Sequence, residues 1–280
     1  MIKEKYTQLP KSRFWYQLVL FVVVLLLIIA IREYISFKLI ENGVESYRVQ
    51  TYLKLIFNLI LIIVSCFFIN KNGLEIIAGI KGAKLTKWYL LLFPLFYLVL
   101  LNLFTMDRID KDIFIPDIST LVLYSISIGI AEELSIHGFL QSYLINGLEK
   151  TKRNVIFSVF VASLFFGLIH LLNFDKGLYG ELSQVCYASF IGAMFGILLV
   201  ITKRIYPLII IHSVIDFFAK LDSTGLPIKE KVSETMSAEN AVFIVLLVLP
   251  CLIYGIFLMK SYPLIDGSFA THNQHIGKLH

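Results

Sequence analysis

Long apolar runs limit the possible fold of this chain more than any other feature of its sequence. About 20 mainly apolar residues are needed for one helix to cross the roughly 30 Å hydrocarbon core of a bilayer. Only 16% of the residues are charged, against about 25% in an ordinary soluble domain. The sequence therefore predicts an all-α fold, a polytopic membrane helix bundle of about eight transmembrane helices. The expected spans lie near residues 14–31, 52–69, 88–104, 118–147, 154–172, 183–202, 205–219 and 240–259.

The organisation along the chain is simple. The sequence has no internal repeat, no low-complexity tract and no long polar linker, so we predict a single membrane domain over residues 1–280. The run at 14–31 is too long for the core of a signal peptide, and we expect it to be a retained helix. Residues 71–88 are either an amphipathic stretch along the membrane surface or an ordinary loop. The three cysteines fall inside predicted spans, where we expect packing residues rather than a disulfide framework.

The basic residues indicate the orientation in the membrane. Lysine and arginine collect in cytoplasmic loops of membrane proteins. With eight alternating crossings, 15 of the 25 basic residues fall on one side and nine in loops on the other. We therefore expect both termini in the cytoplasm, as for an integral protein of a bacterial plasma membrane. The net charge of +5 reflects this bias and predicts no nucleic-acid partner, since no continuous basic stripe is present.

Six ionisable side chains interrupt the predicted spans. A single Asp at the centre of a membrane helix costs on the order of 2.5 to 3.5 kcal/mol, so such residues persist mainly where they face the bundle interior and have a function. One buried histidine alone is more often a packing residue than a catalyst. Six ionisable groups in three spans instead predict a functional site, formed by Glu132, Glu133, His137, His170, His212 and Asp216.

The spacing within two of these spans predicts direct pairs. Residues four apart on an α-helix lie on the same face. Glu133 and His137 have this spacing, and so do His212 and Asp216. We therefore expect each pair to interact on its own helix.

Helix geometry also predicts the depth of the site. Glu132 and His170 each lie about 16 residues from the cytoplasmic end of their spans, or about 24 Å at 1.5 Å per residue. His212 comes out shallower, at about 12 Å, which requires a tilt, a re-entrant start of the helix, or a different boundary. The run at 118–147 is longer than one crossing needs, which predicts a helix that is broken, strongly tilted or extended beyond the lipid.

Three short motifs resemble those of a known family. The chain reads "EELSIH" at 132–137, "FGLIH" at 166–170 and "HSVID" at 212–216. In this order, the motifs are similar to EExxxR, FxxxH and HxxxN/D of the CPBP family, which includes CAAX prenyl proteases and bacteriocin-processing or bacteriocin-immunity proteins. Each motif alone is weak, but their order and their placement in apolar spans make the match specific. The resemblance implies an intramembrane protease with its core at about residues 115–220.

The resemblance also implies roles for the matching residues. Glu132 and His170 would activate a water for attack on a peptide carbonyl, with Phe166 in support. His212 and Asp216 would stabilise the oxyanion. An ionised carboxylate cannot donate a hydrogen bond to an oxyanion, so Asp216 is either protonated or orients His212 instead. The implied substrate is a peptide, or a lipidated or membrane-associated protein, cleaved within or beside the bilayer without a cofactor.

His137 departs from the family motif. Arginine at this position is a permanent cation, whereas histidine is a cation only when protonated. We expect His137 and Glu133 to form a supporting pair for the site.

Three other functions fit the same residues. The carboxylates and histidines are possible zinc ligands, although the sequence has no HExxH motif and the resemblance implies a mechanism without metal. A catalytically degenerate relative would bind a peptide or a membrane partner, as in bacteriocin immunity. A proton-coupled transporter would use the same residues, but the repeats typical of such proteins are not found. The tail from residue 261 contains three more histidines, without the spacing of a metal site.

Overall fold

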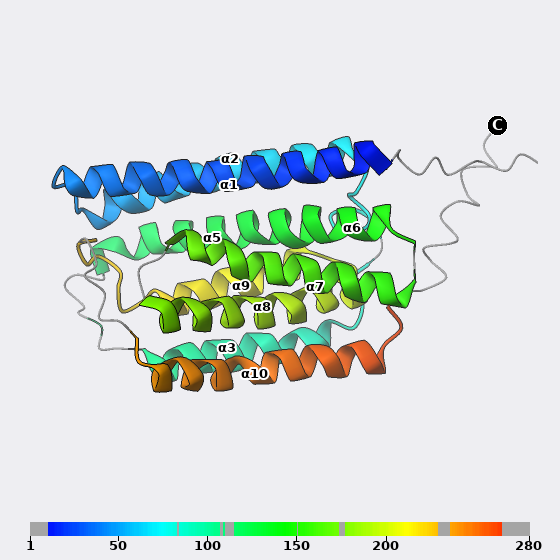
Figure 1. The fold of residues 1–280 in the computed structure, drawn as a ribbon. Coiled ribbons are helices and arrows are strands. Elements are labelled where there is room, and N and C mark those ends of the chain that lie inside the picture. The colour runs from blue at the N-terminus through cyan, green and yellow to red at the C-terminus, as the bar shows by residue number, and fades with distance from the viewer. Residues whose placement is uncertain are drawn as a thin grey trace, which may run out of the picture.

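The computed structural model describes residues 11–82, 84–106, 109, 115–149, 151–173, 177–228 and 236–264. The histidines of the tail therefore lie outside the described residues. The helices, shown in Figure 1, are α1 (Lys11–Glu41), α2 (Tyr47–Lys71), η1 (Trp88–Leu91), α3 (Leu92–Thr105), η2 (Ile115–Asp117), α5 (Ile118–Glu133), η3 (Leu134–Gln141), α6 (Ser142–Gly147), α7 (Lys152–Ile169), η4 (His170–Asn173), α8 (Gly177–Thr202), α9 (Tyr206–Ala219) and α10 (Ala238–Ser261).

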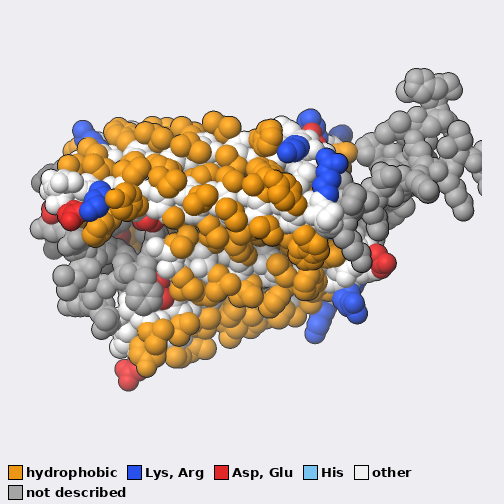
Figure 2. Space-filling view, turned by 45° about the horizontal axis from the view of Figure 1, so that its top comes forward, with side chains coloured by type: hydrophobic (Ala, Val, Ile, Leu, Met, Phe, Trp, Pro, Cys, Tyr) orange, Lys and Arg blue, Asp and Glu red, His pale blue; other side chains and the backbone are white. Residues whose placement is uncertain are grey.

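The bundle confirms the predicted fold class. Among the described residues, seven helical segments are long and apolar enough to cross a membrane, and α9 is a shorter apolar helix. Apolar side chains cover most of the visible outer surface in Figure 2, and the charged side chains lie mainly towards its two ends. An exterior of this kind suits hydrocarbon rather than water. The chain is therefore an integral membrane protein.

The helices pack in three layers (Figure 1). Helices α1 and α2 form one outer layer, and α3 and α10 form the other. Between them lie α5 with its continuation α6, together with α7, α8 and α9. The three motifs all lie in this middle layer, which places the candidate site in the interior of the bundle.

Hydrogen bonds between buried polar side chains join the outer layer to the middle one. Asn58 Nδ2 on α2 donates to Ser127 Oγ on α5 at 2.9 Å, and the hydroxyls of Ser65 and Ser135 lie 2.9 Å apart. Small polar residues allow close approach of membrane helices and satisfy each other in a medium without water. They fix the position of α5 relative to α2.

The fourth predicted span is irregular, as its length suggested. It runs from Ile115 to Gly147, and its middle part, from Leu134 to Gln141, is a π-helix. In a π-helix the backbone hydrogen bonds run from i to i+5, a form that is rare and frequent at functional sites. The wider turn begins directly after Glu133, at the candidate site.

Helix α9 starts inside the bundle. Its 14 residues span about 21 Å, less than the roughly 30 Å of a bilayer core. The turn that joins α8 to α9 is covered by the loop of residues 72–87, since Ile205 N donates to Gly79 O at 3.3 Å and Thr86 N donates to Thr202 O at 3.2 Å. A Cβ on Gly79 would lie 2.8 Å from Ile205 N, so the two backbones meet closely.

This recessed start explains the depth mismatch of His212. The sequence-based estimate assumed that the seventh span begins at the membrane boundary. The loop of residues 72–87 lies beneath the start of α9 instead, so His212 reaches the level of Glu132. The described residues of this loop form turns and bends.

The contact between α5 and α9 at Gly129 yields a testable prediction. A Cβ at this position would lie 2.3 Å from Ser213 Oγ and 2.8 Å from Ile209 O. We expect Gly129→Ala to force the helices apart and to lower the free energy of unfolding by about 1–3 kcal/mol. Gly255→Ala is the matched control, because its nearest contact of 3.4 Å is ordinary. Thermal unfolding in detergent measures both, and equal midpoints would contradict the predicted contact.

Candidate active site

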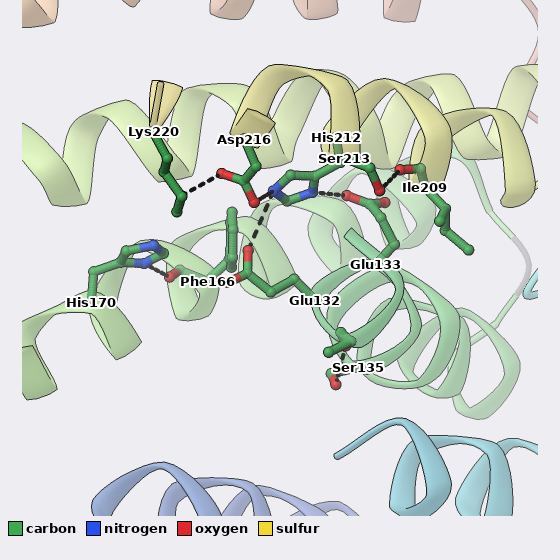
Figure 3. Close-up of polar contacts among 11 residues, drawn as sticks. Glu132, Glu133, Ser135, Phe166, His170, Ile209, His212, Ser213, Asp216 and Lys220 are labelled. Carbon is green, nitrogen blue, oxygen red and sulfur yellow. Dashed lines mark hydrogen bonds and ion pairs between the residues drawn. The ribbon is translucent and has the colours of Figure 1, made fainter. Parts of the chain in front are cut away.

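His212 lies at the centre of a cluster of carboxylates (Figure 3). Its Nδ1 is 2.8 Å from Glu133 Oε1, and its Nε2 is 3.3 Å from Glu132 Oε2. Asp216 Oδ2, one turn further along α9, is 3.9 Å from the same Nε2. The adjacent glutamates at the end of α5 thus hold both nitrogens of one buried imidazole.

These contacts link the proton positions of the three side chains. When Glu133 is ionised, its carboxylate accepts a hydrogen bond from Nδ1–H of His212. When Nε2 is protonated as well, the imidazolium forms an ion pair with Glu132, whose Oε2 lies 3.3 Å away. Glu132 and His212 are therefore close enough to exchange a proton.

His170 has its own fixed orientation. Its Nδ1 lies 2.8 Å from the backbone carbonyl of Phe166, and because a carbonyl only accepts, Nδ1 carries the proton. In the neutral ring, Nε2 therefore keeps a free lone pair. The Phe166 ring lies 5.0 Å from the His170 ring and 6.3 Å from the His212 ring, centroid to centroid. In the FxxxH motif, the backbone carbonyl of Phe166 thus orients His170, and the ring of Phe166 packs beside both histidines.

Five of the predicted residues share one cavity. Glu132, Phe166, His170, His212 and Asp216 all line a cavity of about 560 Å³, whose walls come from the middle layer and from both outer layers. The size is in the range of small-ligand sites. Glu132 and His170 therefore face the same cavity, in agreement with their predicted equal depth.

Lys220 was missed by the sequence interpretation. Its Nζ lies 3.0 Å from Asp216 Oδ1, and its side chain also lines the cavity. The signal was present, since Lys220 follows Asp216 by four residues and so continues the face that carries His212. Lys220 thus places a basic group beside Asp216 at the edge of the site.

The prediction that Glu133 and His137 form a pair is wrong. His137 Nδ1 lies 2.8 Å from Gln141 Oε1, and Gln141 Nε2 donates to Gly196 O on α8 at 3.0 Å. The prediction assumed a regular α-helix, whereas the π-helix widens the turn directly after Glu133, and His212 of α9 takes its carboxylate. His137 therefore supports the packing of the fourth span against α8 and is not among the residues lining the cavity.

Fold and site together define the class of protein: a polytopic helical membrane protein with ionisable groups around an internal cavity. Residues 114–218 match the family model described as type II CAAX prenyl endopeptidase Rce1-like. The match contains all three motifs and confirms the resemblance that they indicate. It supports a CAAX-type endopeptidase at the level of the family. No curated protein and no solved structure gives a significant match to the chain.

The carboxylates and histidines of this cluster are, by residue type, possible zinc ligands. Among the described residues, no three or more His, Cys, Asp or Glu side chains are arranged to hold a metal ion. The imidazole of His212 has each nitrogen directed to a carboxylate.

Gln141 yields a prediction about the fourth span. It is fully buried and joins His137 to the backbone of α8. We expect Gln141→Leu to leave both partners unsatisfied and to lower the free energy of unfolding by about 1–3 kcal/mol. Thermal unfolding in detergent measures this loss. Because Gln141 does not line the cavity, the fraction that stays folded should show the same pH profile of activity as the wild type, and a shifted profile would contradict this assignment.

Proposed function

We propose that the protein is an intramembrane endopeptidase that hydrolyses a peptide bond with a water activated by Glu132 and His170. The observation that carries this proposal is the shared cavity, which these two side chains line together with His212 and Asp216. The match of residues 114–218 to the Rce1-like family supports the same reaction class. The substrate would be a peptide, or a lipidated or membrane-associated protein.

Glu132 is suited to be the general base. Its side chain lines the cavity and is about a third exposed there, in contrast to the fully enclosed Glu133. His170 directs its free Nε2 away from Phe166 O and can hold the attacking water. Glu132 then takes the proton of the water and passes it to the leaving nitrogen of the peptide, which splits the peptide into an acid and an amine.

His212 and Asp216 would act on the carbonyl oxygen. The Nε2–H of a protonated His212 is the donor that can stabilise the developing oxyanion. The ion pair with Lys220 supports an orienting role for Asp216, the second of its two expected roles. In this assignment Glu133 holds His212 in place through Nδ1, as a positioning residue.

The orientation in the membrane follows the charge bias. We propose that both termini are cytoplasmic, since the basic residues collect at the end of the bundle where α1 begins and α10 ends. A plasma membrane of a bacterium fits this chain. A catalytically degenerate relative that binds a bacteriocin or an envelope partner is the second candidate, because His137 stands where the family motif has arginine.

Removal of either water-activating group is the direct test of the reaction. We expect Glu132→Gln and His170→Ala each to lower peptide cleavage by about 10²- to 10⁴-fold, the usual contribution of general acid–base catalysis. Peptidomics of cells that produce each variant measures the products. Glu239→Gln, on the exposed first turn of α10, is the control and should leave them unchanged. Identical products from wild type and both variants, at equal protein levels, would favour the degenerate relative.

Chelator treatment of the purified protein tests the mechanism without metal. We expect cleavage to continue after treatment with a chelator, since Glu132 and His170 supply the groups that activate the water. Elemental analysis of the same sample accompanies the assay. A loss of cleavage that added zinc restores would contradict this mechanism.

The ion pair of Asp216 and Lys220 yields a prediction from a double variant. Loss of one partner of this partly buried pair leaves a charge without its counter-charge, which destabilises the fold. We therefore expect Lys220→Met to lower both the thermal midpoint and the cleavage rate. Asp216→Asn with Lys220→Met should recover much of both, because the neutral amide needs no cation and resembles the Asn of the family motif. A double variant no better than Lys220→Met would contradict this role.

A further inference from the structure

We propose that the cavity opens to the extracytoplasmic side of the membrane, so that the substrate is a peptide segment presented from outside. This inference rests on the proposed function for its substrate and on the proposed orientation for the side of the membrane, whereas the end of the bundle that the cavity reaches is a property of the fold. It depends on which end of the bundle is closed, which end the cavity reaches, and where the basic residues lie.

The cytoplasmic end of the bundle is closed beneath the site. The rings of Phe195 and His212 lie 5.9 Å apart, and α8 ends seven residues after Phe195, only about 10 Å further on. Directly beyond this point, the loop of residues 72–87 is fastened to the α8–α9 turn. Arg204 Nη1 and Nη2 donate to the carbonyls of Ile80 and Gly82 at 3.0 and 3.1 Å. Leu74 and Ala78 of this loop are fully buried.

The fourth and seventh spans add to this closure. Every residue from Leu134 to Ile145 is buried, so the π-helix and the start of α6 leave no exposed side chain below Glu132. The backbone of Gly138 is covered by Ile69 and Ile205, whose atoms lie 3.2 and 3.3 Å from the position of a Cβ. No residue of the π-helix lines this cavity, although Ser135 and Ile136 line a small pocket of about 80 Å³ that shares Glu132 and His170 with it. Beyond this small pocket the fourth span is buried, so the wide cavity ends near the site on this side.

The cavity reaches the other end of the bundle through described residues. Thr105 is the last residue of α3, Gly180 lies three residues after the start of α8, and Met236 lies two residues before α10. All three line the cavity together with Lys220, which directly follows α9. These helix termini lie at the end opposite the start of α1 (Figure 1).

Two helices of the middle layer end at the level of the site. Helix α7 ends at Ile169, next to His170, and α9 ends three residues after Asp216. Their neighbours α5 and α8 continue beyond this level, since Glu132 lies 14 residues from the start of α5, or about 21 Å. The short helices therefore leave a space over the catalytic residues that faces away from the basic end.

The lining of this space suits a peptide rather than a lipid chain. Five polar side chains are among the residues that line this space, namely Asn58, Asn102, Thr105, Ser183 and Gln184. Their amide and hydroxyl groups can also exchange a hydrogen bond inside the protein for one to a bound peptide. The backbone of an extended peptide carries donors and acceptors that need partners inside a membrane. A route lined in this way admits both the peptide and the water that the hydrolysis consumes.

Cysteine accessibility tests the route without a substrate. Asn102→Cys and Gln184→Cys place a thiol on the cavity wall, away from the residues assigned to catalysis. Lys152→Cys, at the exposed start of α7, marks the basic end, and Leu123→Cys marks the lipid-facing surface. A membrane-impermeant thiol reagent is applied to intact cells and to inverted vesicles. Peptide mass spectrometry locates the label and separates it from the three native cysteines, with the wild type as background.

We expect the two cavity thiols to be labelled in intact cells and not in inverted vesicles. Lys152→Cys should show the opposite pattern, and Leu123→Cys should react in neither preparation. Labelling of the cavity thiols only in inverted vesicles, or in neither preparation, would overturn the inference. Because labelling requires no cleavage, outside access in a protein that cleaves nothing would contradict the proposed function while leaving the route in place.

Discussion

The contact between His212 and Glu133 is the interaction on which the site depends. A charge in the membrane interior persists only when it is paired and hydrogen-bonded. By placing Glu133 on one nitrogen of His212 and Glu132 on the other, α5 and α9 satisfy each other's ionisable groups. The same contact fixes the imidazole so that its Nε2 faces the cavity. His212 therefore contributes both to the packing of α5 against α9 and to the chemistry of the site, and it joins two of the three motifs.

The geometry of α9 makes this contact possible. A helix that began at the membrane boundary would place His212 too shallow to meet Glu132. The loop of residues 72–87 lies beneath the short α9, so the first residue of α9 lies inside the bundle. Close approach at Gly129 then brings α5 against α9 just one turn before Glu133. The loop of residues 72–87 lies outside the matched region 114–218, yet it determines how deep His212 lies in the bundle.

The sequence predicts much of this arrangement, for physical reasons. Lipid demands long apolar helices, so the spans and the fold class follow from the apolar runs. The cost of buried charge identifies the six ionisable residues, and helical rise places Glu132 beside His170. The partners of Glu133 and His137 could not be predicted, because a π-helix breaks the spacing on which the argument relied. Lys220 stood at the end of a span and resembled an ordinary interfacial lysine, although its spacing from Asp216 was informative.

The central claim is that Glu133 and His212 hold the site together, and a double-mutant cycle tests it most directly. The free energies of unfolding of wild type, Glu133→Gln, His212→Gln and the double variant are measured in a denaturing-detergent titration. A charge-assisted hydrogen bond in the interior predicts a coupling energy of about 1–3 kcal/mol between the two positions. Additive effects of the two substitutions, with no coupling beyond the error of the measurement, would contradict the account.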